Sequence, residues 1–133
     1  YLANTIKTAC DQGWIETALG RRRYFPVLQG KSNERISVLA RQRAEREAVN
    51  FPIQGTAADI IKIAMIQLHK ELAERHLQAR LLLQVHDELL LEVPRDELSQ
   101  TRDIVVQVMK SAYELNPELV VDTKTGSNWR DLN

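Results

Sequence analysis

The feature that most constrains the fold is a pair of apolar runs that flank a short polar insert. Residues 81–85 and 89–93 are rich in Leu and Val, and residues 86–88 between them read His-Asp-Glu. Two strand-length apolar runs around a polar insert predict a tight antiparallel β-hairpin with the triplet at its turn. Pro94 cannot donate to a strand ladder, so it should close the second strand.

Upstream of this hairpin, apolar periodicity and chain breakers predict three helices and a second hairpin. The segments are, in order, a helix over 1–12, strands over 14–17 and 22–25, a loop over 26–33, and helices over 34–49 and 56–75. Gly13 is placed to end the first helix. The last of these helices has apolar side chains at helical spacing, namely Ala57, Ile60, Ile61, Ala64, Met65, Leu68 and Leu72.

Caps and a proline set the expected ends of the second and third helices. Ser32 or Asn33 can cap the helix over 34–49. Pro52 should break the helix that precedes it, because proline lacks an N–H donor. Thr56 and Asp59 have the spacing of a capping box, so we expect Thr56 to begin the third helix.

After the His-Asp-Glu hairpin, the pattern predicts a helix over 95–114 and a last strand over 119–123. The apolar positions of this helix are Leu98, Val105, Val108, Met109 and Ala112. Helices, hairpins and a final strand in this order predict an α+β fold, in which the antiparallel hairpin and the C-terminal strand pack on helices.

Composition is that of an ordinary globular chain. Of the 133 residues, 44% are hydrophobic and 27% are charged, which argues against disorder. The longest apolar runs fall far short of the roughly 20 residues needed to cross a bilayer, and no secretory signal opens the chain, so no membrane partner is expected. The single cysteine, Cys10, excludes an internal disulfide framework and favours a reducing, cytoplasmic compartment.

The chain begins inside a predicted helix and not at a start methionine. Tyr1 is the first residue, and Leu2, Ile6 and Cys10 already follow helical spacing. We therefore expect the sequence to be a piece of a larger protein. Apolar surface that normally meets the rest of that protein would then be exposed, and the piece should tend to self-associate.

Charge is unevenly distributed although its total is zero. Residues 1–50 hold nine basic and five acidic side chains, a net charge of +4, and residues 51–133 have a net charge of −4. Such a division fits a nucleic-acid face beside a cation-binding face, or chance unevenness on a solvated surface.

Asp87 and Glu88 are the candidate cation ligands. Buried carboxylates are costly unless they are paired or bound to a cation, and hard carboxylate oxygens suit Mg²⁺ or Mn²⁺. Because side chains alternate across a strand, the two carboxylates should point to opposite sides of the sheet, so only one can be directed at a metal. A polar, solvated hairpin turn is the alternative interpretation.

A group of polar side chains is the first candidate for contact with nucleic acid. Arg46, Asn50 and Gln54 recur every four residues, as on one helical face, up to the break expected near Pro52. Amide side chains suit the acceptors that every base pair presents in the minor groove, where a reader must sense pair geometry without regard to sequence. The alternative is a plain polar surface helix.

An arginine cluster is the second candidate. Arg21, Arg22 and Arg23 are followed by Tyr24, and clustered arginines beside an aromatic ring can hold a phosphate backbone. Arginines that are merely solvated on a hairpin are the alternative.

Together these stretches resemble the DNA polymerase I family, family A. Residues 82–94, Leu-Leu-Gln-Val-His-Asp-Glu-Leu-Leu-Leu-Glu-Val-Pro, are similar to the third palm motif of the family. Residues 46–59, Arg-Glu-Ala-Val-Asn-Phe-Pro-Ile-Gln-Gly-Thr-Ala-Ala-Asp, resemble the segment that follows its nucleotide-binding helix. Residues 20–26 resemble a supporting segment of the fingers, and residues 126–129 resemble the C-terminal end of the family. The resemblance covers essentially the whole chain.

The resemblance implies part of a right-handed polymerase, with a fingers-derived portion at 1–53 and a palm portion at 54–133. Asp87 would bind the catalytic divalent metal, with two Mg²⁺ ions in the complete site and Mn²⁺ as a substitute. Glu88 would lie beside it in a supporting catalytic role.

The resemblance also implies how the chain meets DNA. Gln84 and His86 would lie near the primer terminus. Arg46, Asn50 and Gln54 would contact the terminal primer–template pair from its minor-groove side.

The implied reaction is DNA synthesis in replication or repair, with primer–template DNA and a dNTP as partners. The primer 3′-hydroxyl would attack the α-phosphorus of the dNTP. The first palm motif of the family, an Asp followed by Tyr-Ser, is absent from this sequence, and so is the fingers helix that holds the triphosphate. Since a two-metal site needs at least two convergent carboxylates, we expect the isolated chain to be inactive.

Three alternatives stay open. A single-subunit RNA polymerase shares the palm and the His-Asp pair, but typically carries Ser where this chain has Glu88. A non-catalytic DNA-binding module would fit the missing carboxylate. A metal hydrolase would need a ligand cluster, and His69 and His76 lack the spacing of an HExxH motif.

Overall fold

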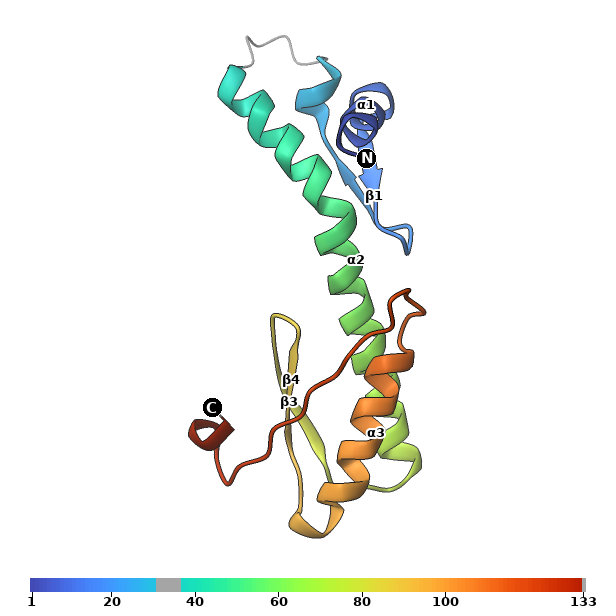
Figure 1. The fold of residues 1–133 in the computed structure, drawn as a ribbon, viewed down its shortest axis with the longest axis vertical. Helices are drawn as coiled ribbons and strands as arrows, with labels where there is room; N and C mark the ends of the chain where they lie inside the picture. The colour runs from blue at the N-terminus through green and yellow to red at the C-terminus, as the bar shows by residue number, and fades with distance from the viewer. Residues whose placement is uncertain (31–36, 133) are drawn as a thin grey trace. The chain divides into compact units, whose positions relative to one another are not determined.

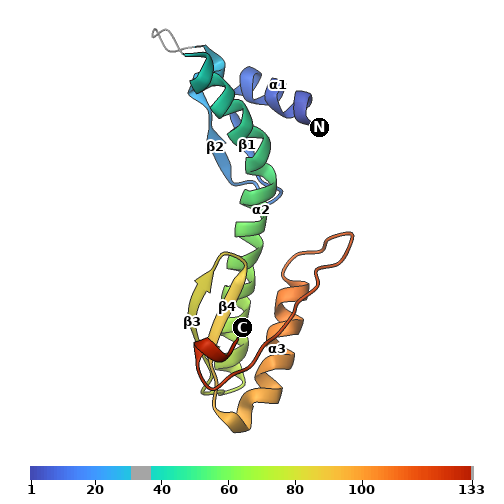
Figure 2. The same ribbon diagram turned by 60° about the vertical axis from the view of Figure 1, so that its left-hand side comes forward.

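The computed structural model describes residues 1–30 and 37–132, which form helices and two small antiparallel sheets (Figure 1, Figure 2). The helices and strands are α1 (Leu2–Gln12), β1 (Trp14–Glu16), β2 (Arg22–Tyr24), α2 (Val38–Glu74), β3 (Arg80–Val85), β4 (Glu88–Glu92) and α3 (Leu98–Ser111). Three short 3₁₀ helices, η1 (Pro26–Gln29), η2 (Arg95–Glu97) and η3 (Trp129–Leu132), complete the set. The mixture of helices and antiparallel sheets confirms the coarse α+β prediction.

The chain forms two compact units, Tyr1–Asp59 and Ile60–Asn133, and each has a hydrophobic cluster of its own. In the first unit the buried cluster comes from α1, the first hairpin, η1 and α2, and consists of Ala9, Ile15, Phe25, Leu28, Ala44 and Ala48. Gly13 ends α1 as predicted, because its φ of 81° is left-handed and its N–H donates to Ala9 O. β1 and β2 pair as the predicted first hairpin, with Ile15 opposite Arg23.

The predicted break at Pro52 is wrong. α2 is one helix of 37 residues with Pro52 inside it, so Thr56 lies in mid-helix and is not a cap. A proline inside a helix removes one backbone donor and costs roughly 3 kcal/mol. The helix continues because apolar side chains are buried on both sides of the proline, at Ala48 before it and Ile61 after it. Tertiary burial therefore outweighs the local breaker.

The start of α2 differs from the predicted cap as well. Ser32 and Asn33, the two predicted caps, lie outside the described residues. Among the described residues, Ser37 precedes the helix, and its Oγ accepts a hydrogen bond from Ala40 N–H at 3.2 Å. This bond satisfies one of the free donors at the first turn of a helix.

In the second unit, the last part of α2 and α3 pack with the β3–β4 hairpin. The buried members of this cluster are Leu68, Leu72, Ala79, Ile104 and Val108, and Leu89 and Leu91 of β4 pack against them. The predicted Leu-rich hairpin and the helix predicted over 95–114 are therefore confirmed. The helix is shorter than predicted, because residues 95–97 form a 3₁₀ turn and α3 ends at Ser111.

The predicted strand at residues 119–123 is wrong. No strand forms there, and Val120 keeps 84% of its surface exposed. An extended segment becomes a strand only when a neighbour pairs with its backbone, and the two sheets of the described chain hold only β1–β2 and β3–β4. The segment instead runs back from the end of α3 toward the β3–β4 hairpin (Figure 1, Figure 2).

In the part of the chain that the structure describes, no helix is both long enough and apolar enough to cross a membrane.

Candidate nucleic-acid interface

The polar triplet lies at the turn of the β3–β4 hairpin, and the turn is tighter than predicted. Val85 pairs with Glu88, so only His86 and Asp87 form the turn and Glu88 is the first residue of β4. His86 has a φ of 54°, and a positive φ at the first central position is typical of two-residue hairpins. Gln84 Nε2 donates to His86 O at 2.7 Å and braces this turn.

Four side chains at this end of the hairpin are exposed, those of Gln84, His86, Asp87 and Glu88. The hairpin therefore presents two adjacent carboxylates, Asp87 and Glu88, at one solvent-accessible end. Within residues 1–30 and 37–132, no group of three or more His, Cys, Asp or Glu side chains is arranged to hold a metal ion. Asp87 can supply one hard oxygen ligand, and the described chain gathers no complete ligand set around it.

The second candidate group lies on α2. Because the helix is unbroken, Arg46, Asn50 and Gln54 share one face, and all three side chains are exposed. The rise of the helix from residue 46 to residue 54 spreads this face over about 12 Å. Arg46 and Asn50 also line a shallow groove of the first unit, together with Leu2, Ile6, Gln42, Glu45 and Val49. We call Arg46, Asn50 and Gln54 the polar stripe.

The arginine cluster is divided between two faces of the first hairpin. Arg22 turns to its own sheet, where Nε donates to Glu16 at 3.3 Å and the guanidinium lies 4.0 Å from the centre of the Trp14 ring. Arg21 and Arg23 turn to α2 instead. This division follows from the alternation of side chains along an extended strand.

Arg21 donates more side-chain hydrogen bonds than either of the other two arginines. Its Nε donates to Asp59 Oδ1 at 2.7 Å, and its second terminal nitrogen donates to Gly55 O at 3.0 Å. Thr17 Oγ1 donates to the other oxygen of Asp59 at 2.7 Å. Asp59 is only 12% exposed, so its charge is satisfied within the unit. The capping-box role predicted for Asp59 is thereby replaced by an ion pair.

Arg23 reaches the same helix nearer its start. Its terminal nitrogen donates to Glu47 at 2.6 Å, and its guanidinium lies 6.0 Å from the centre of the Phe51 ring. Sequence reasoning missed the acidic partners of Arg21 and Arg23. A signal was present, because Glu47, Phe51, Gly55 and Asp59 recur every four residues, which places them along one face of a helix.

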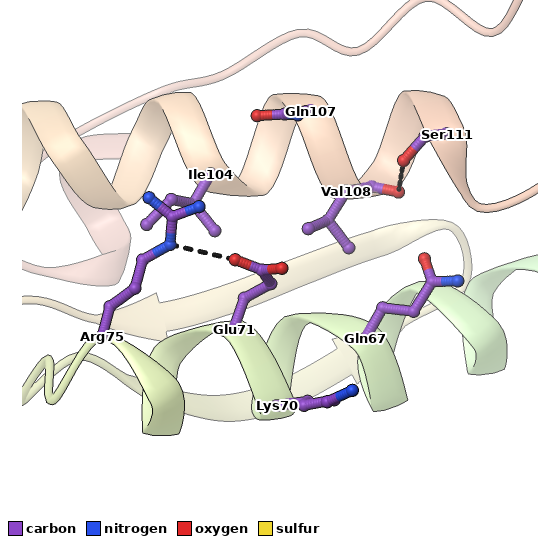
Figure 3. A pocket seen from close by; sticks show the side chains of 8 residues that line it. All are labelled: Gln67, Lys70, Glu71, Arg75, Ile104, Gln107, Val108 and Ser111. Carbon is purple, nitrogen blue, oxygen red and sulfur yellow. Dashed lines mark hydrogen bonds and ion pairs between the residues drawn. The ribbon is translucent and has the colours of Figure 1, made fainter.

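The second unit has a groove of its own, between the last part of α2 and α3. Figure 3 shows the side chains that line it, which are Gln67, Lys70, Glu71, Arg75, Ile104, Gln107, Val108 and Ser111. Arg75 Nε donates to Glu71 at 2.9 Å, and Lys70 lies 3.7 Å from Glu74. Since the basic groups of this groove have acidic partners, it presents little net charge to a ligand.

Comparison with known proteins decides the family. The family model described as DNA polymerase family A matches residues 1–131. The chain belongs to DNA polymerase family A.

Relatives within this family cover almost the whole chain. The DNA polymerase I of Bacillus caldotenax is 47% identical over 131 residues, and that of Lactococcus lactis subsp. cremoris is 46% identical over 129 residues. These matches take in 98% and 97% of this chain but 14% of each relative. This family A chain thus spans about one seventh of the length of the relatives it matches.

A solved structure of the family gives the same fold. It is the POL domain of Pol1 from M. smegmatis in complex with a DNA primer-template and dNTP. The TM-score is 0.91 at 43% sequence identity, over 99% of this chain and 22% of that chain. The arrangement of helices and hairpins described above is therefore similar to a segment of a family A polymerase domain.

Proposed function

We propose that this chain is part of a DNA-directed DNA polymerase that extends a primer on a template with deoxynucleoside triphosphates. The observation that carries the proposal is the likeness to a polymerase domain solved with primer-template and dNTP, at 43% identity over nearly the whole chain. The names of the relatives agree with it. We assign residues 1–53 to the fingers and residues 54–133 to the palm.

Within this proposal, the polar stripe contacts the terminal primer–template pair from its minor-groove side. Exposed amide donors on a continuous helix suit this task, because purine N3 and pyrimidine O2 accept hydrogen bonds at equivalent positions in every pair. Gln84 and His86 lie near the primer terminus. Arg22 is the arginine of the cluster that faces away from α2, and it contacts the DNA backbone in this proposal. Arg21 and Arg23 lie near the backbone, with their charges paired to Asp59 and Glu47 of α2.

Asp87 is the proposed ligand of the catalytic divalent metal. Its carboxylate is exposed at a tight turn braced by Gln84, and hard oxygen donors fit Mg²⁺ or Mn²⁺. Asp87 would help to hold such ions in the complete site, and the chemistry they would supply is activation of the primer hydroxyl and stabilisation of the leaving pyrophosphate. Glu88 lies beside Asp87 at the start of β4 and supports the site.

The alternatives are less well supported. A palm fragment of an RNA polymerase would typically have Ser in place of Glu88, and the relatives that match are named DNA polymerase I. A non-catalytic module and a metal hydrolase gain no support from any of these matches.

The decisive variant is Asp87→Asn in the whole gene product that contains this sequence. This substitution keeps the shape of the side chain and removes its charge. We expect the rate of primer extension with Mg²⁺ to fall about 1,000-fold, because loss of a metal ligand raises the activation free energy by several kcal/mol. Asp96→Asn makes the same change at an exposed site of η2 and should leave extension near the wild-type rate.

The isolated 133-residue chain is assayed beside these proteins and should give no extension product. Equal activity of the Asp87→Asn protein and the wild type would show that Asp87 is not a catalytic ligand. Extension by the isolated chain would show that no further carboxylate is needed.

A further inference from the structure

The two arginines that face α2 contact one line of residues along that helix. Arg23 is paired with Glu47, and Arg21 is bonded to Gly55 O and Asp59. Phe51 lies between these contacts, with the Arg21 and Arg23 guanidinium groups 5.5 and 6.0 Å from the centre of its ring. Side chains four residues apart share a helical face, so the hairpin binds a single face of α2.

These contacts lie on both sides of Pro52. Glu47 precedes the proline by five residues, and Gly55 and Asp59 follow it by three and seven. The missing N–H of Pro52 makes this the weakest point of the helix, where helices commonly kink. Because both arginines belong to the same short hairpin, they hold the helix before and after that point. We call Arg21 and Arg23, with Glu47, Gly55 and Asp59, the arginine splint.

The loop of the hairpin also fits closely against the helix. A Cβ atom at Gly55 would lie 2.6 Å from Thr17 Cγ2 and 3.2 Å from the Phe51 ring. Ala18 N–H donates to Thr56 Oγ1 at 2.9 Å, and Thr56 Oγ1 donates to Pro52 O. The hairpin loop is thus bonded to the turn of α2 that contains the proline.

The polar stripe lies beside the residues that the splint holds. Arg46, Asn50 and Gln54 each precede a residue of the held face, Glu47, Phe51 and Gly55, by one position. One position in an α-helix is a rotation of about 100°, so the two faces are neighbours along the same two turns. A change in the course of α2 at Pro52 would therefore move Gln54 relative to Arg46 and Asn50.

We propose that Arg21 and Arg23 are positioning residues of the polymerase, which fix the course of α2 across Pro52 so that the polar stripe meets the terminal base pair in register. This inference rests on the proposed function of the stripe. The arginines act through the helix. Their effect is on the discrimination between a matched and a mismatched primer terminus.

The test uses the whole gene product and single-turnover extension of two primers, one with a matched and one with a mismatched terminal pair. Arg21→Gln should lower the rate on the matched primer about tenfold, since small misplacements of positioning groups are costly. The rate on the mismatched primer should fall less, so that the matched-to-mismatched ratio decreases. Arg41→Gln removes a comparable ion pair, with Glu45 on α2, and should leave both rates within about twofold.

A second variant separates positioning from simple stability. Pro52→Ala restores the backbone donor at the weak point, so in the Arg21→Gln background it should recover most of the lost ratio. A purely structural arginine would not be rescued in this way, because its loss would lower both rates by the same factor. Non-additivity of the two substitutions is the signature of a shared element.

The outcomes are distinguishable. An unchanged ratio in Arg21→Gln, or an equal fall of both rates, overturns the splint even if Asn50→Ala and Gln54→Ala alter the ratio. If Asn50→Ala and Gln54→Ala also leave the ratio unchanged, the stripe does not read the terminal pair, and the proposed role of the stripe fails together with the splint. Absence of extension by the wild-type protein overturns the proposed function itself.

Discussion

Thr101 is a buried side chain of α3 whose hydroxyl has no hydrogen-bond partner in the described structure. The residue is 2% exposed, and its Oγ1 is buried and makes no hydrogen bond. A buried polar atom without a partner costs about 1–3 kcal/mol. Thr5 offers a contrast, because its Oγ1 donates to Tyr1 O at 3.0 Å while the residue is 9% exposed.

Thr101→Val should therefore stabilise α3. The substitution keeps the branched shape and removes the unsatisfied hydroxyl, so we expect about 1 kcal/mol of added local stability. This corresponds to roughly fivefold slower amide exchange in α3, measured by hydrogen–deuterium exchange on the whole gene product. Thr5→Val loses a hydrogen bond and should not slow exchange in α1. Faster exchange in α3 of Thr101→Val would contradict the prediction.

At the scale of elements, the end of α1 depends on a glycine that is crowded as well as left-handed. Gly13 has a φ of 81°, and a Cβ there would lie 2.3 Å from the amide group of Gln29. Gly20 has a similar φ of 83°, but nothing lies within 4 Å of its Cβ position. The two glycines thus separate backbone strain from steric overlap.

We expect Gly13→Ala to be more destabilising than Gly20→Ala. Each substitution places alanine at a left-handed φ, which lowers the free energy of unfolding by about 1–2 kcal/mol. Gly13→Ala must in addition displace the Gln29 side chain. Thermal unfolding of the two variants of the whole gene product measures the difference. Equal losses would mean that Gln29 moves away at no cost.

The elements differ in how far the sequence could predict them. The Leu-rich hairpin and the helix on Leu68 and Leu72 were predictable, because their periodicity and their tertiary burial agree. The continuity of α2 through Pro52 was not, since it depends on contacts made by distant residues. The strand over 119–123 was not either, because a strand needs a partner and sequence alone does not supply one.

The candidate site shows the same division. The exposure of Asp87 agrees with the alternative of a solvated turn and not with the burial assumed in the argument for a cation. Gln54 shares a face with Arg46 and Asn50 only because α2 continues through Pro52, which the sequence did not predict. Three consecutive arginines do not indicate which acidic side chain each one will pair with, so the separate partners could not be predicted from the sequence. They arise from strand alternation combined with a helix that is remote in sequence. The assignment of these residues to DNA and metal remains a prediction for the variants above.

At the scale of the molecule, large apolar side chains are exposed on β3. Leu82, Leu83 and Val85 keep 52%, 44% and 38% of their surface exposed. In the described chain, β3 pairs only with β4 and leaves one edge open. Open apolar edges tend to pair with other chains.

The isolated 133-residue chain should therefore self-associate as its concentration rises. Light scattering after size exclusion measures the mass, and we expect it to exceed 15.3 kDa increasingly with concentration. Leu82→Lys places a charge on the open edge and should shift the chain toward the monomer. A wild-type chain that stays monomeric at all concentrations would contradict this expectation.

Arg22 faces its own sheet, whereas Arg21 and Arg23 face α2. This alternation also limits which changes in length the gene can accept at β2. Inserting or deleting a single codon between residues 21 and 23 would exchange the two faces of β2, so that one arginine of the splint would point away from α2. A change of two codons would leave both arginines facing α2 and would alter only the distance between them along the strand. Insertions or deletions at this place should therefore be tolerated in steps of two residues and not in steps of one.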